Sequence, residues 1–345
     1  MKDLEANYIV GRYNLFLSLE NKHLCNLIQF AIKLGAKYGY IEVGNILYSR
    51  TTISHHIEEM YYEKREYIKN VIKSLGTNSP ICFTGDIWSD TVNRVSYFDL
   101  TMIYVDESFN LKHHLLDFRP FPERHTAENI FGIVEKISQE YSINHLTVPY
   151  VTDSGSNLKC AFKNGEWYCC FDHRLHTVVE DSWSYTLEND NAVATLFKTM
   201  NDIKAFFHKS SDLESALPTK LPSGCVTRQW TGLSNFFTAF LKSYDTILHI
   251  ITTSSNLSEM PNKILLMKYA EIFQPLKPVF EKLQLSSKPT IHYVVLAYFL
   301  LKKHAQNWPS LAECYKEKFI STLKEKYRGE ITQMHLLALF LHPQL

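Results

Sequence analysis

The sequence has 345 residues, of which 45% are hydrophobic and 21% are charged, and Lys plus Arg equal Asp plus Glu at 36 each. This composition indicates a folded globular protein, long enough for two modest domains or for one domain with an insertion. The balanced charge gives no sign of a nucleic-acid partner, so such a function must come from local patches. No apolar run approaches the roughly 20 residues of a membrane span, and we expect no membrane partner.

The cysteines and the N-terminus indicate the cellular compartment. The seven cysteines are scattered and odd in number, which fits reduced intracellular thiols better than a disulfide framework. The first ten residues, MKDLEANYIV, lack the positive region followed by an apolar region that marks a secretory signal. We therefore expect an intracellular protein.

Residues 1–76 are expected to form a helical N-terminal segment. Apolar residues between Leu15 and Leu34 recur at helical spacing. The stretch Ser49–Ser54 offers a helix N-cap, and an amphipathic pattern continues from it to Leu75. Gly76 and the Thr-Asn-Ser-Pro that follows end this pattern.

From Ile81 the hydrophobic period changes to two, which is typical of β-strands. We expect strands at 81–88, 96–105 and 111–118, and the short link at 106–110 favours antiparallel pairing. A helix at about 126–141, a strand ending at Asp153, a short helix, a strand at 167–171 and a helix from Asp172 follow. The order β-β-β-α-β-α-β-α predicts an α/β fold with a ribonuclease-H-like mixed sheet.

The pattern from residue 191 to the end is helical, with loops marked by prolines. The expected helices are Ala192–Leu213, Phe236–Ser254, Lys263–Leu285, Thr290–Lys303, Ala312–Tyr327 and Ile331–Leu341. We therefore predict three domains: the helical N-terminal segment (1–76), the ribonuclease-H-like core (77–190) and an all-α insertion domain (191–345).

Two of the expected strands each deliver an aspartate, Asp86 and Asp153. An acid at the C-terminal tip of a strand is where α/β proteins place ligands and metals. These two aspartates are far apart in sequence, so they meet only if their strands are neighbours in one sheet. Carboxylate oxygens suit Mg²⁺, and the pair therefore predicts a site for Mg²⁺-dependent phosphoryl transfer. The alternative is that both residues form turns or cap helices.

Several short motifs follow one another along the chain. They are YSRTTIS at 48–54, TGDIW at 84–88, HTAENI at 125–130, TDSGSN at 152–157, CFDH at 170–173, TRQW at 227–230 and QPL to KPT at 274–290. With these motifs in this order, the chain resembles the hAT family of DNA transposases, including its zinc-finger BED-domain and RICESLEEPER-like members, and the host proteins derived from them.

The resemblance implies a nuclear protein derived from a cut-and-paste DNA transposase, with DNA as its partner. Asp86 and Asp153 would be the paired catalytic acids that hold Mg²⁺ or Mn²⁺, and Cys170 and His173 would support the site. The Trp of the family's Thr-Arg-Trp segment stabilises a DNA hairpin, which would make Arg228 and Trp230 DNA-binding residues. The inserted residue between those two turns a helical neighbour by about 100°, so packing of the Trp in the core is an alternative.

Some features of the family are not matched. Its third acid, a Glu within Ser-x-x-Ser-Glu-Arg, lies after the helical insertion, and this sequence contains no Ser-Glu-Arg. We also find no BED zinc-finger pattern before Ile81. We expect an insertion domain truncated before the C-terminal dimerisation region, which leaves a homo-oligomer open, and a catalytically inactive derivative of the transposase.

Other interpretations remain for the site and for the function. Structural zinc at Cys170 and His173 is an alternative to a supporting role, and Trp88 is expected in the core or at a sheet edge. One alternative function is a domesticated DNA-binding or protein-interaction module that needs no metal. The other is a residual metal-dependent nuclease that draws its third acid from Glu180, Asp181 or the helical insertion.

Overall fold

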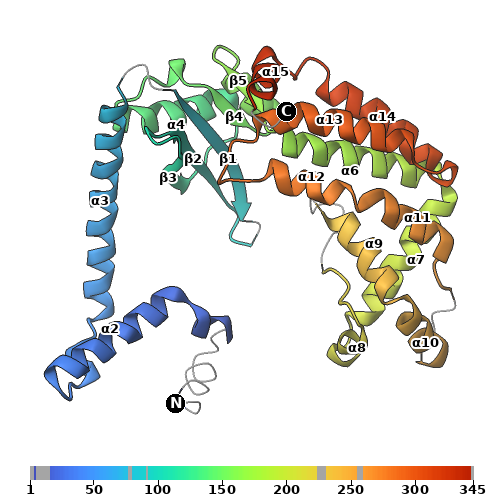
Figure 1. The fold of residues 1–345 in the computed structure, drawn as a ribbon, viewed down its shortest axis with the longest axis horizontal. Coiled ribbons are helices and arrows are strands. Elements are labelled where there is room, and N and C mark those ends of the chain that lie inside the picture. The colour runs from blue at the N-terminus through green and yellow to red at the C-terminus, as the bar shows by residue number, and fades with distance from the viewer. Residues whose placement is uncertain are drawn as a thin grey trace. The chain divides into compact units, whose positions relative to one another are not determined.

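A computed structural model describes Leu4 and residues 16–76, 80–90, 92–223, 231–254 and 259–342 of the chain. The chain divides into two compact units, Met1–Val71 and Ile72–Leu345. The first unit is helical where it is described, and the second holds a β-sheet and the remaining helices (Figure 1). The expected domain boundaries at 76 and 190 stay a prediction.

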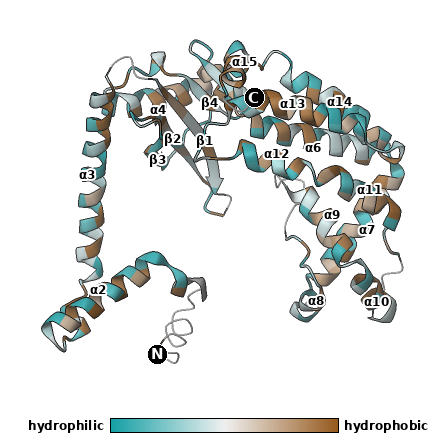
Figure 2. Cartoon of the chain, in the orientation of Figure 1, coloured by the Kyte–Doolittle hydropathy of each residue, from teal (hydrophilic) through white to brown (hydrophobic). Residues whose placement is uncertain are grey.

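The helices of the first unit begin at residues whose side chains can cap them. Asn21 caps α2 (Lys22–Tyr38) with its side-chain oxygen. At the start of α3 (Arg50–Leu75), Ser49 Oγ accepts the backbone N–H of Thr52 at 3.1 Å, as the sequence predicts. α3 is mainly hydrophilic along its length (Figure 2). Two short 3-10 helices complete the described part of this unit, η1 (Phe16–Glu20) and η2 (Val43–Asn45).

The second unit contains a five-stranded sheet in the order β3-β2-β1-β4-β5. Its strands are β1 (Ile81–Asp90), β2 (Val95–Val105), β3 (Leu111–Pro120), β4 (Tyr150–Thr152) and β5 (Trp167–Cys169). β1, β2 and β3 pair antiparallel, whereas β4 pairs parallel with both β1 and β5. The connecting elements are α4 (Ala127–Glu140), η3 (His145–Thr147) and α5 (Ser156–Ala161), and α6 (Phe171–Asn189) follows β5. The predicted α/β class and element order are confirmed.

The two faces of the sheet differ in burial. Alternating residues of β2, Phe98, Leu100 and Met102, are at most 1% exposed and belong to the core. Helix α4 ends against this region, where the Tyr141 hydroxyl donates to the carbonyl of Leu116 at 2.8 Å. Because side chains alternate between faces along a strand, the residues between the buried ones lie on the opposite face. We call this opposite surface of β1–β3 the open face.

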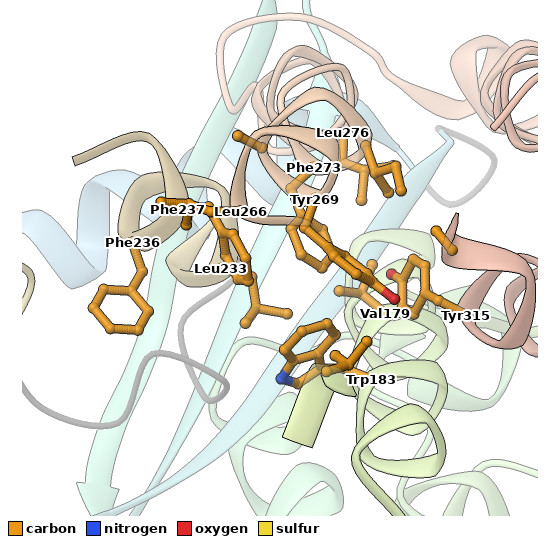
Figure 3. Close-up of a cluster of buried hydrophobic side chains, with 14 of the residues drawn as sticks. Val179, Trp183, Leu233, Phe236, Phe237, Leu266, Tyr269, Phe273, Leu276 and Tyr315 are labelled. Carbon is orange, nitrogen blue, oxygen red and sulfur yellow. The ribbon is translucent and has the colours of Figure 1, made fainter. Parts of the chain in front are cut away.

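Trp183 of α6 is the centre of the helical core. Its ring is fully buried and makes edge contacts with the rings of Phe237, Tyr269, Phe273 and Tyr315 (Figure 3). The buried cluster runs without a break from β5 and α6 into the later helices. Helix α6 therefore belongs both to the sheet topology and to the all-helical region.

Several of the later helices are shorter than the sequence predicts. They are α7 (Asn191–Phe207), α8 (Ser211–Ala216), α9 (Gly232–Lys242), α10 (Tyr244–Ser254), α11 (Lys263–Phe273), α12 (Leu276–Leu283), α13 (Ile291–Gln306), η5 (Ser310–Ala312), α14 (Glu313–Tyr327) and α15 (Gln333–Phe340). The expected single helix at 263–285 is wrong because Pro275 cannot donate to the helical ladder and separates α11 from α12. Similarly, Ser243 separates α9 from α10. Among the described helices, none has the length and apolarity needed to cross a bilayer.

Candidate functional site

The parallel pairing of β1 with β4 brings the two predicted acids to neighbouring strands, beyond the same end of the paired segment. Phe83 pairs with Tyr150, and Thr84 pairs with Val151. Asp86 and Asp153 each lie two residues further along, at the C-terminal side of the paired segment. Adjacent strands are about 4.8 Å apart, and residues two apart share a face. The structure thus places both residues beyond the same end of the β1–β4 pairing, Asp86 within β1 and Asp153 directly after β4, and their catalytic role stays a prediction.

A tight turn after β4 holds the Asp153 carboxylate. Its Oδ1 accepts the backbone N–H of Gly155 at 2.8 Å. A Cβ atom at position 155 would lie 3.0 Å from Asp153 Oδ1 and 2.7 Å from Asn157 Oδ1. Only glycine fits this turn without displacing one of those side chains. The Ser-Gly-Ser-Asn stretch therefore fixes the orientation of the acid, and α5 begins directly after it.

A third aspartate, Asp99, lies beside Asp86 on the open face. Asp86 and Asp99 are cross-strand partners in the β1–β2 ladder, and the backbone N–H of Asp86 donates to Asp99 Oδ1 at 2.7 Å. Partial burial raises the pKa of Asp99, and the negative charge of Asp86 adds to this rise. Asp99 is not among the site residues predicted from the sequence. The signal was present, because the alternation of Phe98, Leu100 and Met102 assigns Asp99 to the other face.

The donor set fits a hard divalent cation. Asp86 Oδ1 accepts the N–H of Ile87 at 2.8 Å, as Asp153 Oδ1 accepts that of Gly155. Within the described residues, no three His, Cys, Asp or Glu side chains gather closely enough to form a metal-binding group. Mg²⁺ often takes only one or two carboxylates and completes its shell with water and substrate phosphate. Two carboxylates are therefore sufficient as protein ligands.

Cys170 and His173 lie at the start of α6, next to the Asp153 turn. The backbone N–H of Cys170 donates to the carbonyl of Thr152 at 2.6 Å, which ties the helix start to the end of β4. Burial raises the pKa of the Cys170 thiol, and the charges of Asp172 and Asp153 contribute further. Among the described residues, no group of three or more His, Cys, Asp or Glu side chains could hold a metal ion, so zinc at Cys170 and His173 would lack further protein ligands. A supporting role for Cys170 and His173 stays our prediction.

The predicted DNA-binding residues Arg228 and Trp230 lie outside the described residues. The structure therefore gives no placement for either side chain, and their role stays a prediction.

Three stacked aromatic rings cross the open face beside the acids. We call Trp88, Tyr97 and Phe118 the aromatic ladder. The Trp88 and Tyr97 rings are 5.5 Å apart between centroids at 29°, and the Tyr97 and Phe118 rings are 5.1 Å apart at 4°. Trp88 is 55% exposed and Phe118 is 53% exposed. Of the two expected places for Trp88, the core is therefore wrong, because the strand alternation turns its side chain to the same open face as Asp86.

A β-bulge contributes to this arrangement. The register between β2 and β3 shifts between Leu100 and Thr101, and Phe118 consequently pairs with Asp99 and stacks on Tyr97. Bulges commonly re-aim side chains next to functional sites. The ladder could not be predicted from sequence, because its assembly depends on this one-residue shift.

Comparison with known proteins identifies related sequences. The family model of the ZBED1 RNase-like domain matches residues 84–164, a range that includes both Asp86 and Asp153. The chain is 27% identical over 344 residues to the Transposable element Hobo transposase of Drosophila melanogaster, covering 98% of this chain and 52% of that protein. It is 24% identical over 335 residues to Zinc finger protein 618 of Homo sapiens and of Mus musculus, covering 94% of this chain and 34% of those proteins. The chain thus spans about half or less of the relatives that it matches.

Proposed function

Because the chain is a hAT-like, transposase-derived protein, we propose that its open face binds DNA in a metal-dependent manner. In this proposal Asp86 and Asp153 hold a divalent cation, Mg²⁺ or Mn²⁺, against a DNA phosphate. The aromatic ladder stacks on unpaired bases next to that phosphate. We place the protein in the nucleus, where this substrate is found.

The observation that carries the proposal is the parallel β1–β4 pairing, which puts two acids on neighbouring strands beyond the same end of the paired segment. Without a cation, Asp86, Asp153 and the nearby Asp99 would repel a phosphate. A bound divalent cation supplies the positive charge that a phosphate requires. Asp99 also orients β1 by accepting the Asp86 N–H at 2.7 Å.

The aromatic ladder supports a substrate with unpaired bases. Stacking on an aromatic ring is worth about 1–3 kcal/mol per base and tolerates any base identity. Trp88 lies two residues from Asp86 on the same strand and face, which is roughly 6.6 Å along β1. A strand whose phosphate is held at Asp86 can therefore place a neighbouring base on Trp88. Paired bases within a duplex do not expose their faces in this way.

Fluorescence anisotropy with a labelled single-stranded oligonucleotide tests this proposal. We expect binding with Mg²⁺ that weakens strongly in EDTA and in Asp153→Asn. The matched control is Asp202→Asn, which changes an exposed aspartate on α7 and should leave binding unchanged. Binding that is equal with Mg²⁺ and with EDTA, and that weakens only with salt, would contradict the proposal and favour a metal-independent DNA-binding module.

Phosphodiester hydrolysis is a second candidate, favoured by the position of Asp99. A third carboxylate beside Asp86 provides a further acid on the open face. Nicking of a supercoiled plasmid in Mn²⁺, lost in Asp99→Asn and in Asp153→Asn alike, would support this activity. The amide oxygen introduced by Asp99→Asn can still accept the Asp86 N–H, so loss of activity would report the charge of Asp99. An intact plasmid would favour DNA binding without cleavage.

A further inference from the structure

A second cavity lies in the same unit, apart from the carboxylate pair. It has a volume of about 320 Å³, and its lining comes from β1, β4, β5 and the ends of α6, α12, α13 and α15. Neither Asp86 nor Asp153 is among its described lining residues. The volume is at the low end of the range for small-molecule sites, which suits a compact ligand.

The lining combines one side of the sheet with the apolar ends of several helices. Val151 on β4 pairs with Thr84 of β1 and with Tyr168 of β5. Cys82 lies two residues before Thr84 and therefore shares its side of the sheet. The helices add further apolar residues to the wall, which are Leu283, Ile291, Val294 and Met334. The cavity is thus enclosed mainly by apolar side chains from segments far apart in sequence.

Contacts around His335 hold this wall in place. Its Nδ1 accepts the backbone N–H of Thr332 at 3.1 Å and so caps α15. Its ring lies edge-on to the rings of Phe171 and Tyr168, with centroids 4.9 Å and 6.1 Å apart. All three rings belong to the lining. A wall that is already ordered loses little conformational entropy when a ligand enters.

Asp172 lines the cavity but offers no charge to a ligand. It is only 4% exposed, and burial raises the pKa of its carboxyl to about 7. Its Oδ2 accepts the side-chain N–H of Gln284 at 3.2 Å. Its Oδ1 is buried away from solvent and therefore does not face the cavity. This acid cannot serve as the partner of a bound cation.

The remaining titratable groups of the lining do not favour a charged ligand either. Burial lowers the pKa of His335, which keeps its ring neutral. Burial also raises the pKa of the lining thiols and phenol, which are those of Cys82, Cys169, Cys170 and Tyr168. Glu166 is exposed to solvent, where an ion pair contributes little. No Lys or Arg is among the lining residues of the described chain.

We propose that this cavity binds a small uncharged molecule with an apolar ring. Transfer of such a molecule from water to the apolar wall is favourable. An ionised molecule of the same shape would lose hydration without gaining a partner of opposite charge. The site therefore selects a neutral ligand over a cation or an anion. This inference does not depend on DNA binding.

Three probes of nearly equal shape test the selectivity. Ethylbenzene is uncharged, benzylamine replaces its methyl group by an ammonium, and benzoate carries a carboxylate on the same ring. Isothermal titration calorimetry at about pH 6, where Asp172 is mostly protonated, compares the three. We expect ethylbenzene to bind, and each charged probe to bind about tenfold more weakly or not at all. Equal or tighter binding of either charged probe would overturn the proposal.

Substitutions at the edge of the cavity locate the binding. Met334 and Ile291 line the cavity and are 49% and 37% exposed, so Met334→Trp and Ile291→Trp should narrow it while leaving the buried core intact. The matched control is Met267→Trp, which changes a 42% exposed methionine of α11 outside the lining. Urea denaturation shows which variants fold.

We expect a folded Met334→Trp or Ile291→Trp protein to lose ethylbenzene binding and the Met267→Trp protein to retain it. Ethylbenzene binding that is unchanged in both cavity variants would place the ligand elsewhere and overturn the proposal. Absence of ethylbenzene binding to the wild type would overturn it as well.

Discussion

Thr84 on β1 and Val151 on β4 are partners in a parallel ladder, and each lies two residues before an aspartate. This pairing relates Asp86 and Asp153 across 66 intervening residues. In an antiparallel arrangement the two strands would end at opposite edges of the sheet, and the acids would be separated. The parallel step from β1 to β4 is therefore the element of topology on which the candidate site depends.

The turn at Gly155 should tolerate no side chain. We expect Gly155→Ala to destabilise the protein by about 1 kcal/mol, because the new Cβ would meet the carboxylate of Asp153 and the amide of Asn157. That amide donates to the carbonyl of His125 at 3.1 Å, so its displacement breaks a contact to the segment before α4. Urea denaturation measures the effect.

Gly132→Ala provides the matched control for the same substitution. Gly132 lies inside α4, and a Cβ there would meet no atom within 4 Å. Alanine should stabilise this helix by about 0.5–1 kcal/mol. If both variants shifted stability in the same direction, the steric account of the Gly155 turn would be wrong.

Trp183 and Trp88 should respond very differently to truncation. Trp183 is fully buried and contacts a ring of aromatic side chains, and Trp183→Ala should cost about 3–5 kcal/mol. Trp88 is 55% exposed, so Trp88→Ala should cost much less and instead weaken binding of single-stranded DNA. Urea denaturation measures the stability of each variant, and fluorescence anisotropy on the same samples measures its affinity for single-stranded DNA.

An exposed aromatic residue elsewhere tests whether the aromatic ladder binds DNA because of its place on the open face. Phe299 on α13 is 60% exposed but lies outside the open face. Phe299→Ala should leave DNA affinity unchanged. A loss of affinity in Phe299→Ala equal to that in Trp88→Ala would indicate a nonspecific hydrophobic effect.

Asp172 should make stability fall as the pH rises. Burial raises its pKa from 3.8 to about 7 in the folded protein. Between these values the folded state keeps the proton while the unfolded state loses it, so raising the pH through this window favours unfolding. A difference of roughly three pKa units corresponds to about 4 kcal/mol. The destabilisation caused by Asp172 is absent below pH 3.8 and complete above about pH 7.

Asp172→Asn isolates this dependence. The variant should gain stability relative to the wild type as the pH rises from about 4 to about 8, by a few kcal/mol. His335 titrates in both proteins and cancels in the difference, and the pKa of Cys170 is raised above 9.0, outside this range. Urea denaturation of both proteins across this pH range measures the difference between their free energies of unfolding. A difference that stays constant with pH would contradict a buried acid at position 172.

The fold class and the strand positions of Asp86 and Asp153 could be predicted from sequence because each rests on local patterns. The change of period at Ile81 marks the sheet, and the apolar runs before Asp86 and Asp153 mark two strands that carry acids. The helix at 263–285 was predicted as continuous, although Pro275 was present to end it. Propensity alone did not show which prolines interrupt a helix and which only mark its start.

The other features depend on contacts between distant segments. The aromatic ladder needs the exact register of three strands, including the shift between Leu100 and Thr101. A cavity of about 320 Å³, lined in part by Cys82, Asp172 and His335, is built from segments that lie far apart in the sequence. No local pattern encodes such an assembly, and Asp172 reads in sequence as an ordinary acid in the first turn of a helix.

Binding of Mn²⁺ in the presence of a single-stranded oligonucleotide tests the central claim most directly. Electron paramagnetic resonance of Mn²⁺ measures the fraction that remains free, for the wild type, Asp153→Asn and the control Asp202→Asn. We predict that the wild type and the control bind Mn²⁺ and that Asp153→Asn does not. Equal Mn²⁺ binding by all three proteins, or binding by none of them, would contradict a cation site at Asp86 and Asp153.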